Sequence, residues 1–214
     1  MNLISLVVVA SGMVLIPDGT YVPFFRDGGE GNQEIHSFTV DRLPVTTREF
    51  LEFVKANPEW RKSNVKRIFA DERYLLSLGG PQTPITQVSW FAARAFCEAK
   101  GKRLLTVAEW EYASDAHNPQ HLQSILEWYA VPSGTLMNVE KATVNRFGLK
   151  GMHGLIWEWV EDFSSVMIPG GSFCGGGALK AKDPNQYATF MRFAFRSSLK
   201  ADSTVSTLGF RCAK

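Results

Sequence analysis

The sequence predicts a single α+β domain in which three helices come first and irregular β structure follows. Two capping boxes and a serine N-cap indicate the helices, all of which lie before residue 114. From residue 145 onward, short apolar pieces alternate with glycines, a pattern typical of short strands and turns. The chain has 214 residues, of which 45% are hydrophobic, so it is long enough to bury a substantial core.

Residues 1–12 stand apart from residues 13–214, which we expect to form the domain without an internal linker. The apolar run at residues 3–10 is too short to span a bilayer and has no basic region before it. Two interpretations stay open. The run is either the remnant of a secretory signal, with Val8 and Ala10 as small residues before a cleavage point, or a buried first strand.

Two strands are predicted before the first helix. Residues 13–21 form an apolar strand that ends in a Pro-Asp-Gly turn. In residues 36–41, Phe38 and Val40 alternate with polar neighbours, which indicates a half-buried strand.

The helices are indicated by the residues at their starts. Thr46 and Glu49 form a capping box for the first helix, and Pro58 lies where that helix stops. Ser89 is a good N-cap for the second helix, over residues 90–100.

A second capping box, formed by Thr106 and Glu109, opens the third helix over residues 107–113. Glu109 and Glu111 are interpreted as a capping residue and a surface charge. They are not expected to form an acid–base pair, because helix positions two apart do not face each other. A weaker helix is indicated over residues 124–130. The apolar pieces at residues 157–160, 170–173, 190–196 and 208–212 are assigned to the irregular β part.

Composition excludes one class of partner and leaves the cysteines open. The formal net charge is +2 and no run of lysine or arginine tracks a phosphate backbone, so nucleic acid is not an expected partner. Three cysteines, Cys97, Cys174 and Cys212, allow at most one disulfide, and their spacing does not say which pair forms.

Five segments resemble, in order, the formylglycine-generating enzyme (sulfatase-modifying factor) family. The resemblance runs from residue 13 to residue 213. Its segments are MVLIPDGT at residues 13–20, PVT with EF and F at 44–53, PITQVSW through AEWEYA at 84–113, NRFGL through WEWV at 145–160, and GGS at 170–172 with the terminal RSS and LGFRCA at 196–213.

The resemblance implies a fold related to C-type lectins, with little regular secondary structure. It also implies periplasmic or secreted residence, and a disulfide between Cys97 and Cys212, which would leave Cys174 as the free thiol. A protein or peptide partner is expected, without a membrane span. The oligomeric state is left open.

In active members of that family, a Gly-Gly-Ser turn presents two cysteines that hold copper(I), which activates dioxygen to oxidise a cysteine of a sulfatase peptide. Two soft thiolates suit copper(I). This chain keeps the turn with Ser172 and then Cys174, the candidate catalytic residues, but Leu179 stands five positions after Cys174. Cys174 is therefore either a copper ligand helped by Met167, Met191 or His153, or an inert buried thiol.

Gly154, Ile156 and Glu158 match positions where the resembled family binds calcium, through two backbone carbonyls and a carboxylate. Oxygen ligands of this kind suit calcium. The alternative is that Glu158 forms a structural salt bridge with Arg192 or Arg196.

Two functions follow from the resemblance. The first is an accessory or maturation factor that binds a protein partner. The amino-acid sequences of residues 145–163 and 190–212 are most similar to the NirV subgroup, whose members are encoded beside copper nitrite reductases. This similarity implies a role in denitrification. The second is a copper- and dioxygen-dependent oxidase that acts on a protein cysteine or a related thiol through Cys174. An iron-dependent carbon–sulfur-forming branch is disfavoured, because its three-histidine helical domain has no counterpart in this sequence.

Overall fold

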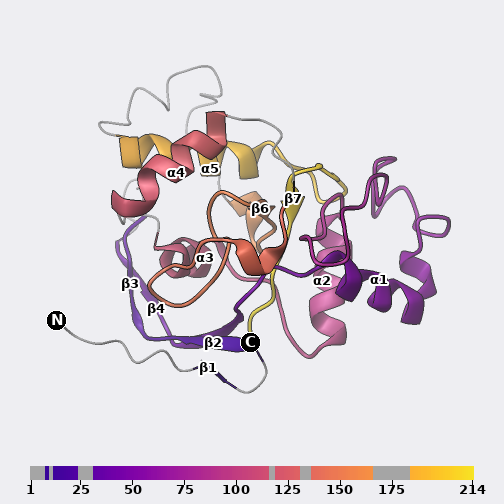
Figure 1. Ribbon diagram of the computed structural model, residues 1–214, viewed down its shortest axis with the longest axis horizontal. Helices are drawn as coiled ribbons and strands as arrows, with labels where there is room; N and C mark the ends of the chain where they lie inside the picture. The colour runs from indigo at the N-terminus through magenta and orange to yellow at the C-terminus, as the bar shows by residue number, and fades with distance from the viewer. Residues whose placement is uncertain (1–7, 10–11, 24–30, 116–118, 131–135, 166–183) are drawn as a thin grey trace.

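The computed structural model describes residues 8–9, 12–23, 31–115, 119–130, 136–165 and 184–214. It is a mixed structure of helices and very short strands. Figure 1 shows α1 and α2 on one side of the molecule and the paired helices α4 and α5 on the other, with small sheets between and below them. Among these described residues, no helix combines the length and apolar character that crossing a membrane requires.

The first sheet is antiparallel, with the strand order β1-β2-β5. Its strands are β1 Val8–Val9, β2 Met13–Ile16 and β5 Phe38–Asp41. Val14 lies opposite Val40 and both side chains are buried, as the predicted alternation requires. The C-terminus covers the other edge of β5, where Thr39 and Lys214 exchange backbone hydrogen bonds of 2.9 and 2.7 Å. Residues 8–9 thus pair with β2 in the sheet. That residues 1–12 are the remnant of a secretory signal stays a prediction.

Two further pairs of strands complete the β structure. β3 Gly19–Tyr21 pairs antiparallel with β4 Gln33–Ile35, and β6 Trp157–Glu158 pairs parallel with β7 Leu208–Gly209. A Cβ atom at Gly209 would lie 2.2 Å from the carbonyl oxygen of Ile85. Glycine is therefore needed where β7 passes this backbone, and it fixes how closely the C-terminal segment approaches the core.

The three predicted helices begin where their caps place them. They are α1 Thr47–Ala56, α2 Trp90–Ala99 and α3 Val107–Ser114. Both capping boxes are formed, and the Ser89 hydroxyl accepts from the N–H of Ala92. α1 packs on α2 through Phe53 and Phe96, whose ring centroids lie 5.4 Å apart in an edge-to-face arrangement. Short 3₁₀ turns follow at η1 Pro58–Trp60, η2 Val139–Lys141 and η3 Phe163–Ser165.

Two helices differ from the sequence prediction. The weak helix predicted at residues 124–130 begins earlier, as α4 Pro119–Ala130, because proline is tolerated in a first helical turn. Residues 190–196, assigned to irregular β structure, belong instead to the 14-residue helix α5 Pro184–Ser197. The reason is that Arg192 and Arg196, four residues apart, both face the interior, so the buried face of α5 does not appear as an apolar stripe.

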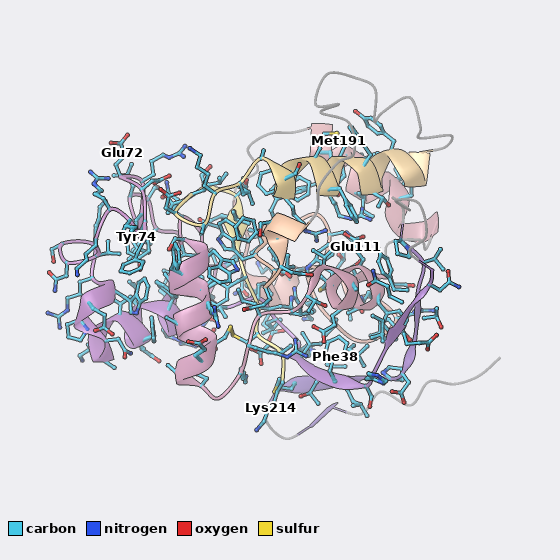
Figure 2. The ribbon with its side chains drawn as sticks, turned by 180° about the vertical axis from the view of Figure 1, so that it is seen from behind. Phe38, Glu72, Tyr74, Glu111, Met191 and Lys214 are labelled. Atoms are coloured by element: carbon cyan, nitrogen blue, oxygen red, sulfur yellow. A yellow bond between two sulfur atoms is a disulfide. The ribbon has the colours of Figure 1, made fainter. Side chains whose placement is uncertain are left out.

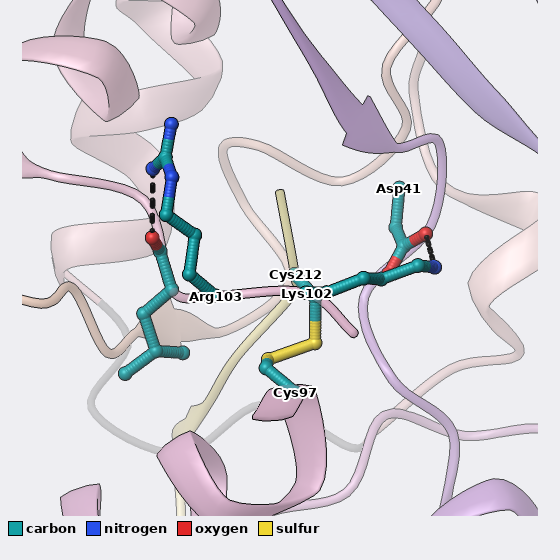
Figure 3. The surroundings of a disulfide bond; sticks show 6 residues. Asp41, Cys97, Lys102, Arg103 and Cys212 are labelled. Carbon is teal, nitrogen blue, oxygen red and sulfur yellow. Dashed lines mark hydrogen bonds and ion pairs between the residues drawn. A yellow bond between two sulfur atoms is a disulfide. The ribbon is translucent and has the colours of Figure 1, made fainter. Parts of the chain in front are cut away.

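Cys97 of α2 and Cys212, which follows β7, form a disulfide with a Cα–Cα distance of 5.6 Å. It is the pair that the resemblance implied. Figure 3 shows how the chain turns beside it: Lys102 and Arg103 point in opposite directions. Lys102 reaches Asp41 at 2.6 Å, and Arg103 donates to the carbonyl of Leu104 at 3.0 Å. The disulfide therefore ties the second helix to the C-terminal segment beside β5.

Candidate functional site

The predicted catalytic residues Ser172 and Cys174 lie outside the described residues, and so does Leu179. Of the three candidate supporting ligands, Met167 also lies outside the described residues, and the other two can be located. His153 lies with Nε2 3.1 Å from the carbonyl oxygen of Ser114, and Met191 is half-buried on α5. Figure 2 places Met191 on the side of α5 away from Glu111.

A buried carboxylate lies beneath α5, the helix that follows the Cys174 segment in the sequence. Glu111 of α3 is 4% exposed. Arg192 donates to it from Nε at 3.0 and 3.1 Å and from Nη2 at 2.7 Å, and Arg196 donates from Nη1 at 2.6 Å. One carboxylate thus binds two successive turns of α5 and fixes that helix on α3. Figure 2 shows Glu111 beneath α5.

The charges of this cluster do not balance. Burial raises the pKa of Glu111, but the positive charges and hydrogen bonds of Arg192 and Arg196 outweigh burial and lower that pKa to about 2. Two arginines therefore face one carboxylate. Arg192 also donates to the hydroxyl of Thr189 at 3.0 Å, and the guanidinium of Arg196 lies 4.7 Å from the ring centroid of Trp110. The aromatic face is a second, weaker partner for the surplus charge.

Glu111 was predicted to be a surface charge, and this prediction was wrong. The reasoning that Glu109 and Glu111 do not face each other is confirmed: Glu109 closes the capping box and binds Arg103 at 2.7 Å. The opposite face of α3, however, points into the core. The only signal in the sequence was the pair of arginines four residues apart on α5, which becomes informative only once that segment is known to be a helix.

A stack of aromatic rings joins α4, β6 and α5. Trp157 lies between Tyr129, at 4.9 Å with nearly parallel planes, and Phe195, at 4.4 Å. Burial raises the pKa of the Tyr129 hydroxyl, which lies 3.5 Å from Arg192. The void beside this stack measures about 10 Å³, room for a single water at most. In the described residues the stack is therefore packing, and it does not form a ligand pocket.

The predicted calcium ligands do not fit a calcium site. Arg211 donates from Nε to both carboxylate oxygens of Glu158 at 3.0 Å and from Nη2 at 2.8 Å, while Trp110 Nε1 donates at 2.8 Å. The side chains of Glu158 and Arg211 are both 0% exposed. A calcium ion at Glu158 would lie against the buried guanidinium of Arg211. The carboxylate of Glu158 is therefore not available to complete a calcium site with the carbonyls of Gly154 and Ile156.

The alternative prediction, a structural salt bridge of Glu158, is correct, but the predicted arginine partners are wrong. Glu158 forms a buried salt bridge, with Arg211 rather than with Arg192 or Arg196. Among the residues that the structure describes, no group of three or more histidine, cysteine, aspartate or glutamate side chains could hold a metal ion. Trp110 links the two buried clusters, because its N–H binds Glu158 while its ring faces Arg196.

Comparison with known proteins gives a family match over nearly the whole chain. A family model described as the sulfatase-modifying factor enzyme 1-like domain matches residues 6–214. Among solved structures, CarF aligns with a TM-score of 0.52 at 20% identity and covers 94% of this chain and 97% of its own, which supports the fold.

Among curated proteins, the serine/threonine-protein kinase pkn1 of Chlamydia pneumoniae is 26% identical over 96% of this chain. This chain spans 38% of that kinase's length. The formylglycine-generating enzyme of Bos taurus is 26% identical over 94% of this chain and 74% of its own length. The inactive C-alpha-formylglycine-generating enzyme 2 of Bos taurus is 23% identical over 91% of this chain and 83% of its own length.

Proposed function

Because this chain belongs to the sulfatase-modifying factor enzyme 1-like family, we propose that it is an accessory or maturation factor that binds a protein partner. The observation that carries the proposal is the number of cysteines that the disulfide leaves free. The sequence has three cysteines, and the disulfide occupies Cys97 and Cys212. Cys174 is left as the single thiol, with Leu179 where the resembled enzymes have their second cysteine. One thiolate cannot form the two-thiolate copper(I) site.

Two further observations support a role without catalysis. The matched relatives include a protein named as an inactive formylglycine-generating enzyme, so the sequence pattern is compatible with loss of activity. In the described residues the two buried carboxylates, Glu111 and Glu158, are both held in ion pairs with arginines. A carboxylate paired in this way is not free to bind a substrate, and breaking the pair would leave a buried charge without a partner.

The location and pathway are part of the proposal. A disulfide persists in an oxidising compartment, which favours the periplasm or secretion. The similarity of residues 145–163 to the NirV subgroup supports a role in denitrification, beside a copper nitrite reductase. The relation to C-type lectins that the resemblance implies is supported by strands of only two to four residues.

The second candidate is a copper- and dioxygen-dependent oxidase, and the retained Gly-Gly-Ser turn with Ser172 and Cys174 favours it. Copper(I) would supply dioxygen activation in such an enzyme. Cys174 would hold the metal as a thiolate, and the chain would need a ligand other than cysteine to complete the site.

Copper(I) titration against a calibrated chelator separates the two functions, with Cys174→Ser as the matched control. We expect the disulfide-intact protein to bind copper no more tightly than the variant, and both to unfold at the same denaturant concentration. In parallel, mass spectrometry should find no conversion of cysteine to formylglycine in a sulfatase-derived peptide incubated with copper and air. One-to-one binding that depends on Cys174, together with peptide oxidation, would establish the oxidase instead.

A further inference from the structure

A cleft of about 750 Å³ opens between residues 41–49 and the C-terminal end of α2. Glu140 and Gln82 contribute to its walls, and Leu43 and Pro44 give it an apolar strip. This volume lies within the range of pockets that hold organic ligands or peptide segments, far above what one ion needs. None of the predicted site residues lines it.

The acidic groups of the cleft are already engaged. Asp41 binds Lys102 at 2.6 Å. Glu140 binds Lys150 at 2.8 Å and Arg42 at 3.5 Å. The remaining acid, Glu49, accepts from the backbone N–H of the capping residue of α1 at 2.8 Å. No acidic side chain lining the cleft is therefore left without a partner.

Two cations of the cleft lack an acidic partner in the described part of the chain. Arg48 has a neutral partner in Gln82: with the Gln82 amide turned so that its oxygen faces the guanidinium, that oxygen accepts from Nη2 at 2.9 Å and from Nη1 at 3.0 Å. The ammonium group of Lys100 lies 5.1 Å from the ring centroid of Phe96. Both cationic residues are exposed, so binding a carboxylate would desolvate them little.

We propose that this cleft docks an acidic segment of the partner protein, with side-chain carboxylates on Arg48 and Lys100 and an apolar side chain against Leu43 and Pro44. The inference rests on the proposed partner-binding function and specifies its site and the chemistry of the partner. Two separated cations beside an apolar strip fit a peptide with spaced acids, and they do not form the continuous basic stripe that nucleic acid requires.

Fluorescence anisotropy with a rhodamine-labelled, cysteine-free peptide of alternating glutamate, glycine and leucine tests the proposal. We expect saturable binding by the full chain, and no binding of the same peptide with lysine in place of glutamate. The double variant Arg48→Glu/Lys100→Glu should weaken binding at least tenfold. The neutral variant Arg48→Gln/Lys100→Gln should fall between it and the unaltered protein.

The matched control is Lys66→Glu/Arg67→Glu, which makes the same change of charge at exposed residues outside the cleft. It should keep binding within about twofold, since exposed charges outside the cleft act on the peptide only through screened solvent. Equal weakening by both double variants would show non-specific attraction and overturn the proposal. Absence of binding to the unaltered protein at millimolar peptide would also overturn it.

Light scattering, which measures the oligomeric state, tests whether a second copy of this chain occupies the cleft. A dimer that Arg48→Glu/Lys100→Glu dissociates would mean that a second copy of the chain fills the cleft, which contradicts a separate partner. The assay reads binding alone and the peptide has no cysteine. Copper-dependent oxidation through Cys174 would therefore overturn the proposed function without deciding the result at the cleft.

Discussion

Replacing Glu111 by glutamine removes the one negative charge that Arg192 and Arg196 share, at nearly constant side-chain volume. The carboxyl has an ordinary pKa of 4.5 and a pKa of about 2 in the folded protein, where burial opposes ionisation but the two guanidinium groups outweigh it. At 1.36 kcal/mol per pH unit, this difference corresponds to about 3 kcal/mol of stabilisation at neutral pH. Removing one partner of a buried ion pair costs roughly 3–5 kcal/mol. We therefore expect Glu111→Gln to lower the free energy of unfolding by about that amount at pH 7.

The penalty should depend on pH in a defined direction. Because the folded pKa lies below the unfolded pKa, the stabilisation by Glu111 is complete above pH 4.5 and is lost as the pH falls toward 2. By pH 3 the difference in stability between the protein and Glu111→Gln should have shrunk by about 2 kcal/mol. Urea unfolding followed by tryptophan fluorescence, at pH 7 and at pH 3, measures both quantities.

Glu98→Gln is the matched control, because Glu98 pairs with Arg94 at 2.9 Å in an exposed position. It should cost less than about 1 kcal/mol. A cost for Glu111→Gln below about 1 kcal/mol at pH 7 would refute the reasoning, and so would a penalty that is the same at both pH values. In the Glu111→Gln background, Arg192→Met should cost less than it does alone, because the ion pair is already broken.

Three further outcomes are expected. Cys97→Ser should lower stability under oxidising conditions by up to about 5 kcal/mol, since the disulfide closes a sequence separation of 115 residues; an unfolding midpoint equal to that of the intact protein would contradict this. Calcium added after chelator treatment should leave the melting temperature unchanged, because Arg211 occupies the carboxylate of Glu158. A clear rise of the melting temperature in calorimetry would instead support calcium binding at Glu158. Thr106→Ala should cost about 1 kcal/mol through loss of the α3 capping box, measured by urea unfolding against Thr20→Ala, an exposed strand position.

Local chemistry explains which elements could be predicted. Both capping boxes and the Ser89 cap depend on residues within three positions of each other, so they are visible before any fold is known. The alternation around Phe38 and Val40 is equally local. The α5 helix was missed because its buried face carries arginines, which makes its period look irregular.

The candidate site was predicted less completely, for a related reason. The sequence showed a retained Cys174 and a missing second cysteine, and the resemblance supplied the pairing of Cys97 with Cys212. The cleft was not foreseen, since Arg48 and Lys100 lie on different elements and neither belongs to a motif. Nothing in the spacing of such residues indicates that they share a surface.

By itself, the sequence determined the starts of α1, α2 and α3, the number of cysteines and the family resemblance, because each depends on residue identity and short-range spacing. The tertiary structure decided which charges meet. Glu111 finds Arg192 81 residues away, and Glu158 finds Arg211 53 residues away. A buried carboxylate must be paired wherever it lies, but its partner is decided by tertiary packing: α5 lies over Glu111 of α3, and the C-terminal segment runs beside Glu158 of β6.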